Sequence, residues 1–330
     1  PSDIYQGAYW YIFIIFMGIP ATFLYNLLAA IIRSLGDSKT PVYFLAISSV
    51  LNIGLDLAFI LMFQMGVAGA ALATVLSQGV SGLACLVYMV KKFPILHMSR
   101  EERRLDGRSC RALCFMGVPM GLQYSITAIG SIFLQSAVNS LGSLYVAAVA
   151  AGGKLFQLLG CPYDALGATM ATYSGQNVGA VKLDRLGQGV RACSLLGFVY
   201  ALIAFGGMLL FAPQGAMLFL DPTEPELTTL VALTAQYIRT LTAFFFALAL
   251  VNIVRFSIQG MGFSGLAILA GVMEMIARTA VGLIFVPMFG YTAACFASPA
   301  AWICADAFLI PACIGSINRL RKIYAKEPEA

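Results

Sequence analysis

Charged side chains are scarce in this sequence. Only 11% of its 330 residues are charged, whereas 60% are hydrophobic, and the mean hydropathy is +0.87. Soluble globular domains carry about 25% charged residues, so the composition excludes that class. It favours an all-α membrane protein, a polytopic helical bundle in which each segment satisfies its own backbone hydrogen bonds.

Side chains suited to metal or catalytic chemistry are also few. The chain has one His, and its 8 Cys are scattered through apolar segments without a CxxC pair. It contains no HExxH, no GxSxG and no paired acidic motif of a prenyl transferase. We therefore expect no enzyme, no cofactor and no metal site other than one for sodium.

Long apolar runs predict nine transmembrane helices, each long enough for the roughly 20 residues that a bilayer requires. The predicted spans are 8–33, 41–63, 67–90, 112–139, 145–172, 189–212, 232–259, 266–287 and 291–318. The first, third and fifth connecting loops and the C-terminal tail hold most of the 20 Lys and Arg residues. Because basic loops face the cytoplasm, the C-terminus is expected to be cytoplasmic. The net charge of +5 then reflects topology, and no nucleic-acid partner is expected.

Two polar residues interrupt the second predicted span. Asn52 and Asp56 are four positions apart, so they share one face of a helix. A carboxylate at that depth costs about 3 kcal/mol on insertion scales, and such groups usually face the protein interior at functional sites. Asp56 is therefore predicted either to bind a sodium ion or proton or to hydrogen-bond a neighbouring helix.

The sequence contains an internal repeat, as many secondary transporters do. Asn26 is followed ten residues later by Gly36, and Asn252 is followed ten residues later by Gly262. The spans that follow keep the same order, so the first three spans resemble the last three. Spans four to six have no counterpart. We interpret the chain as part of a parent with two six-span halves, in which the first three spans are absent here.

A polar stripe crosses the fourth predicted span at four-residue steps, a spacing that places its members on one helix face. Its members are Gln123, Thr127, Ser131, Gln135 and Asn139. The stripe is expected either to line a substrate cavity or to hydrogen-bond neighbouring helices. Gln123, Thr127 and Gln135 are the cavity candidates.

An acid and a base lie one turn apart in the eighth predicted span. Glu274 and Arg278 are expected to form an internal ion pair, which is either structural or part of a substrate cavity. The repeat places Arg278 opposite Asn52. Arg255 is expected to extend towards the cytoplasmic surface, and Asp306 has no evident partner.

Several stretches resemble the multidrug and toxic compound extrusion (MATE) family. They are RSLGD (33–37) with KTP (39–41), NIGLD (52–56), GVAGAALAT (66–74), GVP (117–119), NSLG (139–142) and GQNVGA (175–180). The resemblance implies a two-lobed, twelve-helix exporter of organic, often cationic, drugs and toxic compounds, driven by sodium or protons. It implies a monomer in a bacterial-type plasma (inner) membrane, with the lipid bilayer and small organic molecules as partners.

The resemblance also assigns domains and site residues. Residues 1–92 would form the C-terminal half of the N-lobe, 93–111 a cytoplasmic linker, 112–324 the C-lobe and 325–330 a tail. Family members with an N-lobe cation site place its ligands at positions matching Asn52, Asp56 and Thr74, with Tyr11 and Asn26 nearby. Spans 112–139 and 232–259 lack the acids that other members use in the C-lobe.

An alternative function shares this helical plan: a flippase for lipid-linked sugars or polysaccharides. Such a protein is expected to need a strongly cationic cavity for a pyrophosphate. Only Lys154, Arg255 and Arg278 are available near a C-lobe cavity within the spans, so the exporter is favoured.

Overall fold

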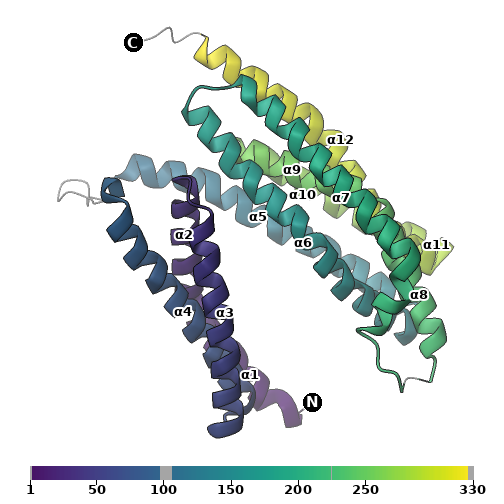
Figure 1. Ribbon diagram of the computed structural model, residues 1–330. Helices are drawn as coiled ribbons and strands as arrows, with labels where there is room; N and C mark the ends of the chain where they lie inside the picture. Colours follow the sequence, from purple (N-terminus) through teal and green to yellow (C-terminus); the bar gives the residue numbers. More distant parts are fainter. Residues whose placement is uncertain (1, 97–105, 224, 326–330) are drawn as a thin grey trace. The chain divides into compact units, whose positions relative to one another are not determined.

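The computed structural model describes residues 2–96, 106–223 and 225–325, and these residues form helices with no strand among them (Figure 1). The prediction of an all-α bundle is confirmed. The chain divides into two compact units, Pro1–Leu105 (unit 1) and Asp106–Ala330 (unit 2). Their boundary falls within the predicted linker 93–111, and each unit is described separately below.

Unit 1 is organised around its last long helix. Its elements are α1 (Ser2–Met17), α2 (Ile19–Ser34), α3 (Lys39–Leu57), the π-helical turn η1 (Ala58–Met62), α4 (Gly66–Lys92) and the short 3₁₀ turn η2 (Pro94–Leu96). Helix α4 packs against α1, α2 and α3. The buried core between α2 and α4 contains Tyr25, Leu28, Ala29, Ile32 and Cys85.

Unit 2 contains the remaining helices and the larger core. Its elements are α5 (Gly107–Asn139), α6 (Ser143–Gly179), α7 (Asp184–Met217), α8 (Leu227–Ala243), α9 (Phe245–Gly260), α10 (Ser264–Ala280), the π-helical turn η3 (Val281–Phe285), α11 (Val286–Phe289) and α12 (Tyr291–Tyr324). Helix α9 packs against α6, α7 and α12, and α10 packs against α5 and α12. These contacts surround the cavity described below.

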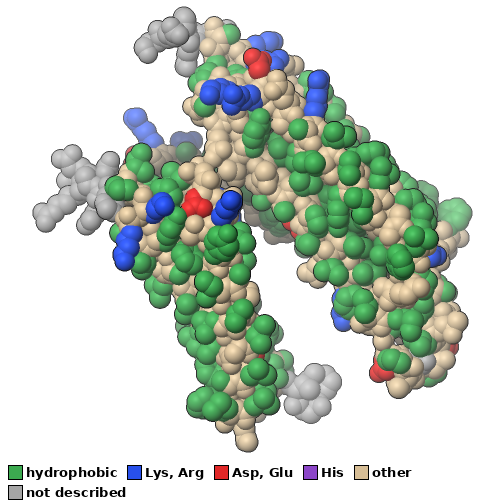
Figure 2. Space-filling model, in the orientation of Figure 1, with side chains coloured by type: hydrophobic (Ala, Val, Ile, Leu, Met, Phe, Trp, Pro, Cys, Tyr) green, Lys and Arg blue, Asp and Glu red, His purple; other side chains and the backbone are tan. Residues whose placement is uncertain are grey.

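The helices reproduce the nine predicted spans. Within the described residues, seven elements are single helices long and apolar enough to cross a membrane, and two bent helix pairs raise the number to nine. The pair α1–α2 bends by 40° at Gly18, just before Pro20, and the pair α8–α9 bends by 50° at Phe244. Hydrophobic side chains cover much of the visible surface of both units (Figure 2), as a lipid environment requires.

The repeat extends to details of the backbone. Each copy of the repeat, α1–α4 in unit 1 and α8–α12 in unit 2, has a bent helix pair, then a helix ending in a π-helical turn (η1 or η3), then a long helix. The turns between these helices use glycines with positive φ, namely Gly36 (95°) and Gly66 (56°) in unit 1 and Gly262 (89°) and Gly290 (61°) in unit 2. Glycine adopts this region without steric cost, so the repeated glycines fix where each helix ends.

The predicted linker is shorter than expected at its C-terminal end. Helix α5 begins at Gly107, because Asp106 caps it by accepting hydrogen bonds from the backbone N–H groups of Arg108 (3.2 Å) and Ser109 (3.0 Å). The apolar pattern begins only near residue 112, so it did not reveal the polar first turn. The residues from His97 to Leu105 lie outside the described part of the chain.

A polar cluster ties the α2–α3 turn to α4. The Asp37 carboxylate accepts hydrogen bonds from the Tyr88 hydroxyl (2.6 Å), the Thr40 hydroxyl (2.7 Å) and the Thr40 backbone N–H (3.1 Å). These donors, the Tyr88 hydroxyl foremost, lower the pKa of Asp37 to about 2. The ionised carboxylate therefore stabilises this end of unit 1.

Replacing Asp37 by Asn should lower stability at neutral pH by about 1 kcal/mol, since the site is only half-buried and solvent screens it. A depressed folded-state pKa contributes stability above the unfolded pKa, near 4, and loses it as the pH falls through about 2. Thermal unfolding in detergent should show a difference from wild type at pH 7 that shrinks at pH 3. Glu226→Gln is the control, because the Glu226 side chain is exposed and makes no capping hydrogen bond within the described residues. A pH-independent difference would contradict this account.

A second stability test concerns the contact between α6 and α9. A Cβ atom at Gly260 would lie 2.3 Å from the carbonyl oxygen of Ala171, so Gly260→Ala must push the helices apart at a cost of about 1–3 kcal/mol. Gly265→Ala is the matched control, since a Cβ there meets nothing within 4 Å. Equal unfolding temperatures for the two variants would refute the close packing.

Candidate functional site

The two polar residues singled out in unit 1 lie together on α3. Asn52 and Asp56 are half-buried and one helical turn apart. Within the described structure, the buried Nδ2 of Asn52 and Oδ1 of Asp56 have no hydrogen-bond partner. The helix widens into the π-helical turn η1 directly after Leu57, and such turns occur often at functional sites. The structure thus places an unsatisfied carboxylate and amide beside a local irregularity.

The other residues predicted for the cation site lie on three further helices of unit 1. Thr74 on α4 donates its hydroxyl to the Ala70 carbonyl (3.0 Å), and Asn26 on α2 donates its amide to the Thr22 carbonyl (3.0 Å). Tyr11 on α1 is exposed. No hydrogen bond among the described residues joins these three side chains to Asp56, and their membership of one site stays a prediction.

The polar stripe of α5 divides into separate environments. Gln123 is buried and accepts a hydrogen bond from Gln259 Nε2 on α9 (2.8 Å). The Thr127 hydroxyl is buried without a partner in the described structure, and Gln135 is exposed and donates to Asn139 (2.9 Å). Gln123 therefore makes an interhelical hydrogen bond, which was the alternative to a role in a substrate cavity. Gln123, Thr127 and Gln135 do not line the unit 2 cavity that is described next.

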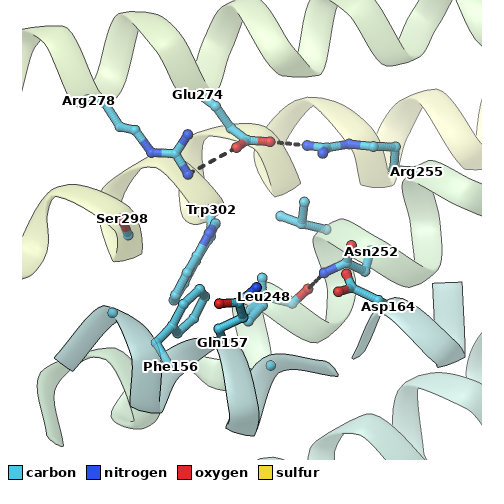
Figure 3. Close-up of a pocket in the computed structure, with 13 residues that line it drawn as sticks. Phe156, Gln157, Asp164, Leu248, Asn252, Arg255, Glu274, Arg278, Ser298 and Trp302 are labelled. Atoms are coloured by element: carbon cyan, nitrogen blue, oxygen red, sulfur yellow. Dashed lines mark hydrogen bonds and ion pairs between the residues drawn. The ribbon is translucent and has the colours of Figure 1, made fainter. Parts of the chain in front are cut away.

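A cavity of about 470 Å³ lies within unit 2, between α6, α9, α10 and α12 (Figure 3). This volume is within the range of small-molecule sites. Its polar lining includes Gln157, Asp164, Asn252, Arg255, Glu274, Arg278 and Ser298, and its aromatic lining is Phe156 and Trp302. The two rings stack with centroids 5.9 Å apart and planes 17° apart. The cavity thus combines an apolar platform with charges of both signs.

Three buried charges form one wall of this cavity. Glu274 forms an ion pair with Arg278 on its own helix (3.3 Å) and accepts a hydrogen bond from Arg255 on α9 (Figure 3). The predicted Glu274–Arg278 ion pair is confirmed as a contact. The expectation that Arg255 extends to the cytoplasmic surface is wrong: its side chain is only 9% exposed. The Glu274 carboxylate on α10 lies within reach of Arg255, and pairing with it offsets the free-energy cost of burying the isolated Arg255 charge.

Not every charged group in this region is paired. Arg278 Nη1 and Arg255 Nε are buried without a hydrogen-bond partner in the described structure. Asp164 on α6 contributes a carboxylate to the cavity and has no ion pair there among the described residues. Asp306 on α12 is buried, with Oδ1 unpartnered, and interacts electrostatically with Arg255 and Glu274. It does not line the cavity.

Sequence reasoning missed part of this cavity. The repeat identified Asn252 without assigning it to a site, and no role was predicted for Asp164, Phe156 or Trp302. The available signal was the repeat, because Asn252, the counterpart of Asn26, lines the cavity. Arg278, which the repeat is predicted to place opposite Asn52, also lines it, but Arg278 lies three residues before its π-helical turn and Asn52 six residues before its own.

Solved structures share this fold. The chain superposes on the crystal structure of a MATE in complex with MaL6 with a TM-score of 0.87 and 22% identity, covering 95% of this chain and 70% of that one. The MatE family model matches residues 119–284. The chain belongs to the MATE family, whose members are multi-pass membrane transporters and not enzymes. The model of the lipid II flippase MurJ matches residues 5–153.

Two curated relatives from Bacillus subtilis (strain 168) agree with this membership. The chain is 38% identical over 184 residues to the probable multidrug resistance protein YpnP, covering 54% of this chain and 40% of the relative. It is 31% identical over 231 residues to the probable multidrug resistance protein YoeA, covering 68% of this chain and 50% of the relative. The chain therefore spans half or less of the length of these relatives.

The three-charge wall predicts an order of stabilities. Glu274→Gln removes the negative charge that two buried guanidinium groups share and should cost about 3–5 kcal/mol. Arg255→Gln leaves the Glu274–Arg278 pair intact and should cost less. Thermal unfolding in detergent measures both variants, and an Arg255→Gln variant as unstable as Glu274→Gln would show that Glu274 is not the shared partner.

Proposed function

We propose that the whole protein is a cation-coupled antiporter that exports organic, often cationic, compounds across the plasma membrane. Asp56 would bind the coupling ion, and its occupancy would shift the balance between inward- and outward-facing states. The observation that carries the proposal is the buried Oδ1 of Asp56, which lies within an apolar span and has no hydrogen-bond partner among the described residues.

The chemistry of the Asn52 and Asp56 side chains fits either coupling ion. A carboxylate and an amide carbonyl are hard oxygen ligands of the kind that alkali and alkaline-earth cations accept. A carboxylate held away from water can equally take up a proton. An acceptor already saturated by protein donors would serve neither purpose, so the free Oδ1 of Asp56 supports the proposal.

The working unit we propose is a single chain with a cytoplasmic C-terminus. Basic side chains gather where α12 ends and α7 begins (Figure 2), and Arg321 on α12 pairs there with Asp184 on α7 at 2.9 Å. This concentration of basic residues supports the cytoplasmic orientation.

The flippase remains the second candidate, because the lipid II flippase model matches residues 5–153. A pyrophosphate needs several uncompensated cations, however. In the unit 2 cavity, Glu274 already contacts both Arg255 and Arg278, and Asp164 adds a further negative charge. The cavity is therefore poorly suited to a polyanion, which favours the exporter.

Ethidium efflux from vesicles carrying the whole protein tests the proposal, with sodium and proton gradients imposed separately. We expect one gradient to drive efflux and Asp56→Asn to abolish it, because the variant lacks the ion-binding carboxylate. Asp37→Asn is the matched control: it removes a carboxylate from the same unit outside the proposed site and should retain most efflux.

Insertion of each variant is checked by its amount in the membrane fraction. Efflux unchanged in Asp56→Asn would make Asp56 a structural residue and end this mechanism. Movement of a lipid-linked sugar without movement of ethidium would favour the flippase.

A further inference from the structure

A groove of about 410 Å³ lies between α7, α9 and α12 of unit 2. Helix α9 packs against both of the other helices, whereas α7 and α12 do not pack closely against each other in the described structure. Helix α9 therefore forms the floor of the groove, where it contributes Leu250 and Val254. The α12 wall is apolar and consists of Ile310, Cys313, Ile314 and Ile317. No residue lines both this groove and the charged cavity described above.

One end of the groove, called the mouth here, is polar and basic. It is lined by Arg191 on α7 and by Asn318 and Arg321 on α12, at the end of unit 2 where basic side chains gather (Figure 2). Arg321 pairs with Asp184, but these side chains are 50% and 90% exposed, so solvent screens the pair. Arg191 forms no ion pair within the described residues. Two guanidinium groups and one carboxylate give the mouth a net positive charge.

The apolar wall has the length of one lipid leaflet. Ile310 and Arg321 are separated by about 16 Å along α12, at a rise of 1.5 Å per residue. The hydrocarbon core of a bilayer is about 30 Å thick, so each leaflet contributes about 15 Å. Arg321 also follows closely after the apolar span that the sequence predicts to end at residue 318. An acyl chain lying along this wall would therefore bring its headgroup to the mouth.

The mouth also has room for a phosphate group. Gly187 lies one turn before Arg191 on α7, and a Cβ atom there would meet nothing within 4 Å. Helical side chains lean towards the N-terminus of their helix, so Arg191 extends past Gly187 towards the membrane surface. Arginine binds phosphate oxygens through paired N–H donors. A zwitterionic headgroup would add a cation beside these arginines, whereas an anionic headgroup would not.

We propose that this groove binds one anionic phospholipid. Its phosphate lies between Arg191 and Arg321, and one acyl chain lies along α12 over the floor formed by α9. Basic pockets between membrane helices are a recognised design for anionic headgroups. The inference goes beyond the proposed function, because lipid binding here requires neither an ion gradient nor an exported solute. Its test is therefore independent of the efflux assay.

Native mass spectrometry of the purified whole protein in detergent tests the proposal with two lipids. Dioleoylphosphatidylglycerol and dioleoylphosphatidylcholine have the same acyl chains and differ in headgroup charge. We expect phosphatidylglycerol to bind more tightly. Arg191→Gln should weaken its binding about fivefold, since a basic residue near an anionic headgroup contributes about 1 kcal/mol. Phosphatidylcholine binding should change by less than about twofold, because its headgroup carries no net charge.

Arg185→Gln is the matched control for Arg191→Gln. It removes a charge of the same sign from the same end of α7, but Arg185 does not line the groove. Phosphatidylglycerol affinity should change by less than about twofold in this variant. Equal effects of the two substitutions would show that the lipid responds only to the general charge of this surface, and they would overturn the proposal.

Two further variants should act in opposite directions. Gly187→Leu adds a side chain to the mouth without changing any charge, so it should weaken phosphatidylglycerol binding at least as much as Arg191→Gln. Its unfolding temperature should not fall, because Leu favours a helix more than Gly does and the space beside Gly187 is open. Asp184→Asn removes the acid that competes for Arg321 and should tighten phosphatidylglycerol binding by up to about fivefold. Unchanged binding in a folded Gly187→Leu variant would rule out the groove.

A photoreactive lipid locates the bound molecule. Phosphatidylglycerol with a diazirine on one acyl chain should label α12 between Ile310 and Ile317, and Gly187→Leu should reduce this label. No label in this stretch, as when another segment of the whole protein covers the groove, would refute the proposal. Displacement of the lipid by an equal concentration of soluble glycerol phosphate would make the ligand a free phosphate and refute the acyl-chain contact. The expected lipid pattern without ethidium efflux would support this inference and refute only the exporter.

Discussion

The cost of burying a polar group without a partner shapes this protein more than any other single constraint. In an apolar surrounding the backbone must satisfy itself, which leaves helices as the spanning elements, and every side-chain charge must find a partner or serve a ligand. The structure contains both outcomes. Glu274 is shared by two guanidinium groups, whereas Asp56 keeps a buried oxygen with no partner among the described residues. The first arrangement stabilises the fold, and the second leaves an acceptor free for a ligand.

The same constraint explains why the repeat is conserved in backbone details between the two halves. A break in a membrane helix exposes N–H and carbonyl groups, so breaks are confined to places where neighbouring helices compensate. Both halves place a bend within the first helix pair and a π-helical turn at the end of the next helix. Glycines with positive φ then end the helices at Gly36, Gly66, Gly262 and Gly290.

The sequence predicted the membrane spans well because apolar length is a local feature. Apolar length identified nine spans, and the four-residue spacing of Glu274 and Arg278 identified a real ion pair. The contacts between distant helices could not be predicted in this way. Arg255 pairs with Glu274 and Gln123 with Gln259 only because α9 packs among its neighbours, and no spacing rule encodes such packing. The start of α5 was misplaced for a different reason, since an Asp cap and a polar first turn carry no apolar signal.

The two units arrange their polar groups differently on helices of the same design. The helices that carry Asn52 and Arg278 both lead into a π-helical turn, but Asn52 lies six residues before its turn and Arg278 three residues before its own. Asp56 keeps an acceptor free, whereas Glu274 is occupied by Arg255 and Arg278. A cation bound at Asp56 and a solute bound in unit 2 would therefore make no demand on the same group. Coupling between them would then operate through a conformational equilibrium that both ligands bias, rather than through direct competition for one carboxylate.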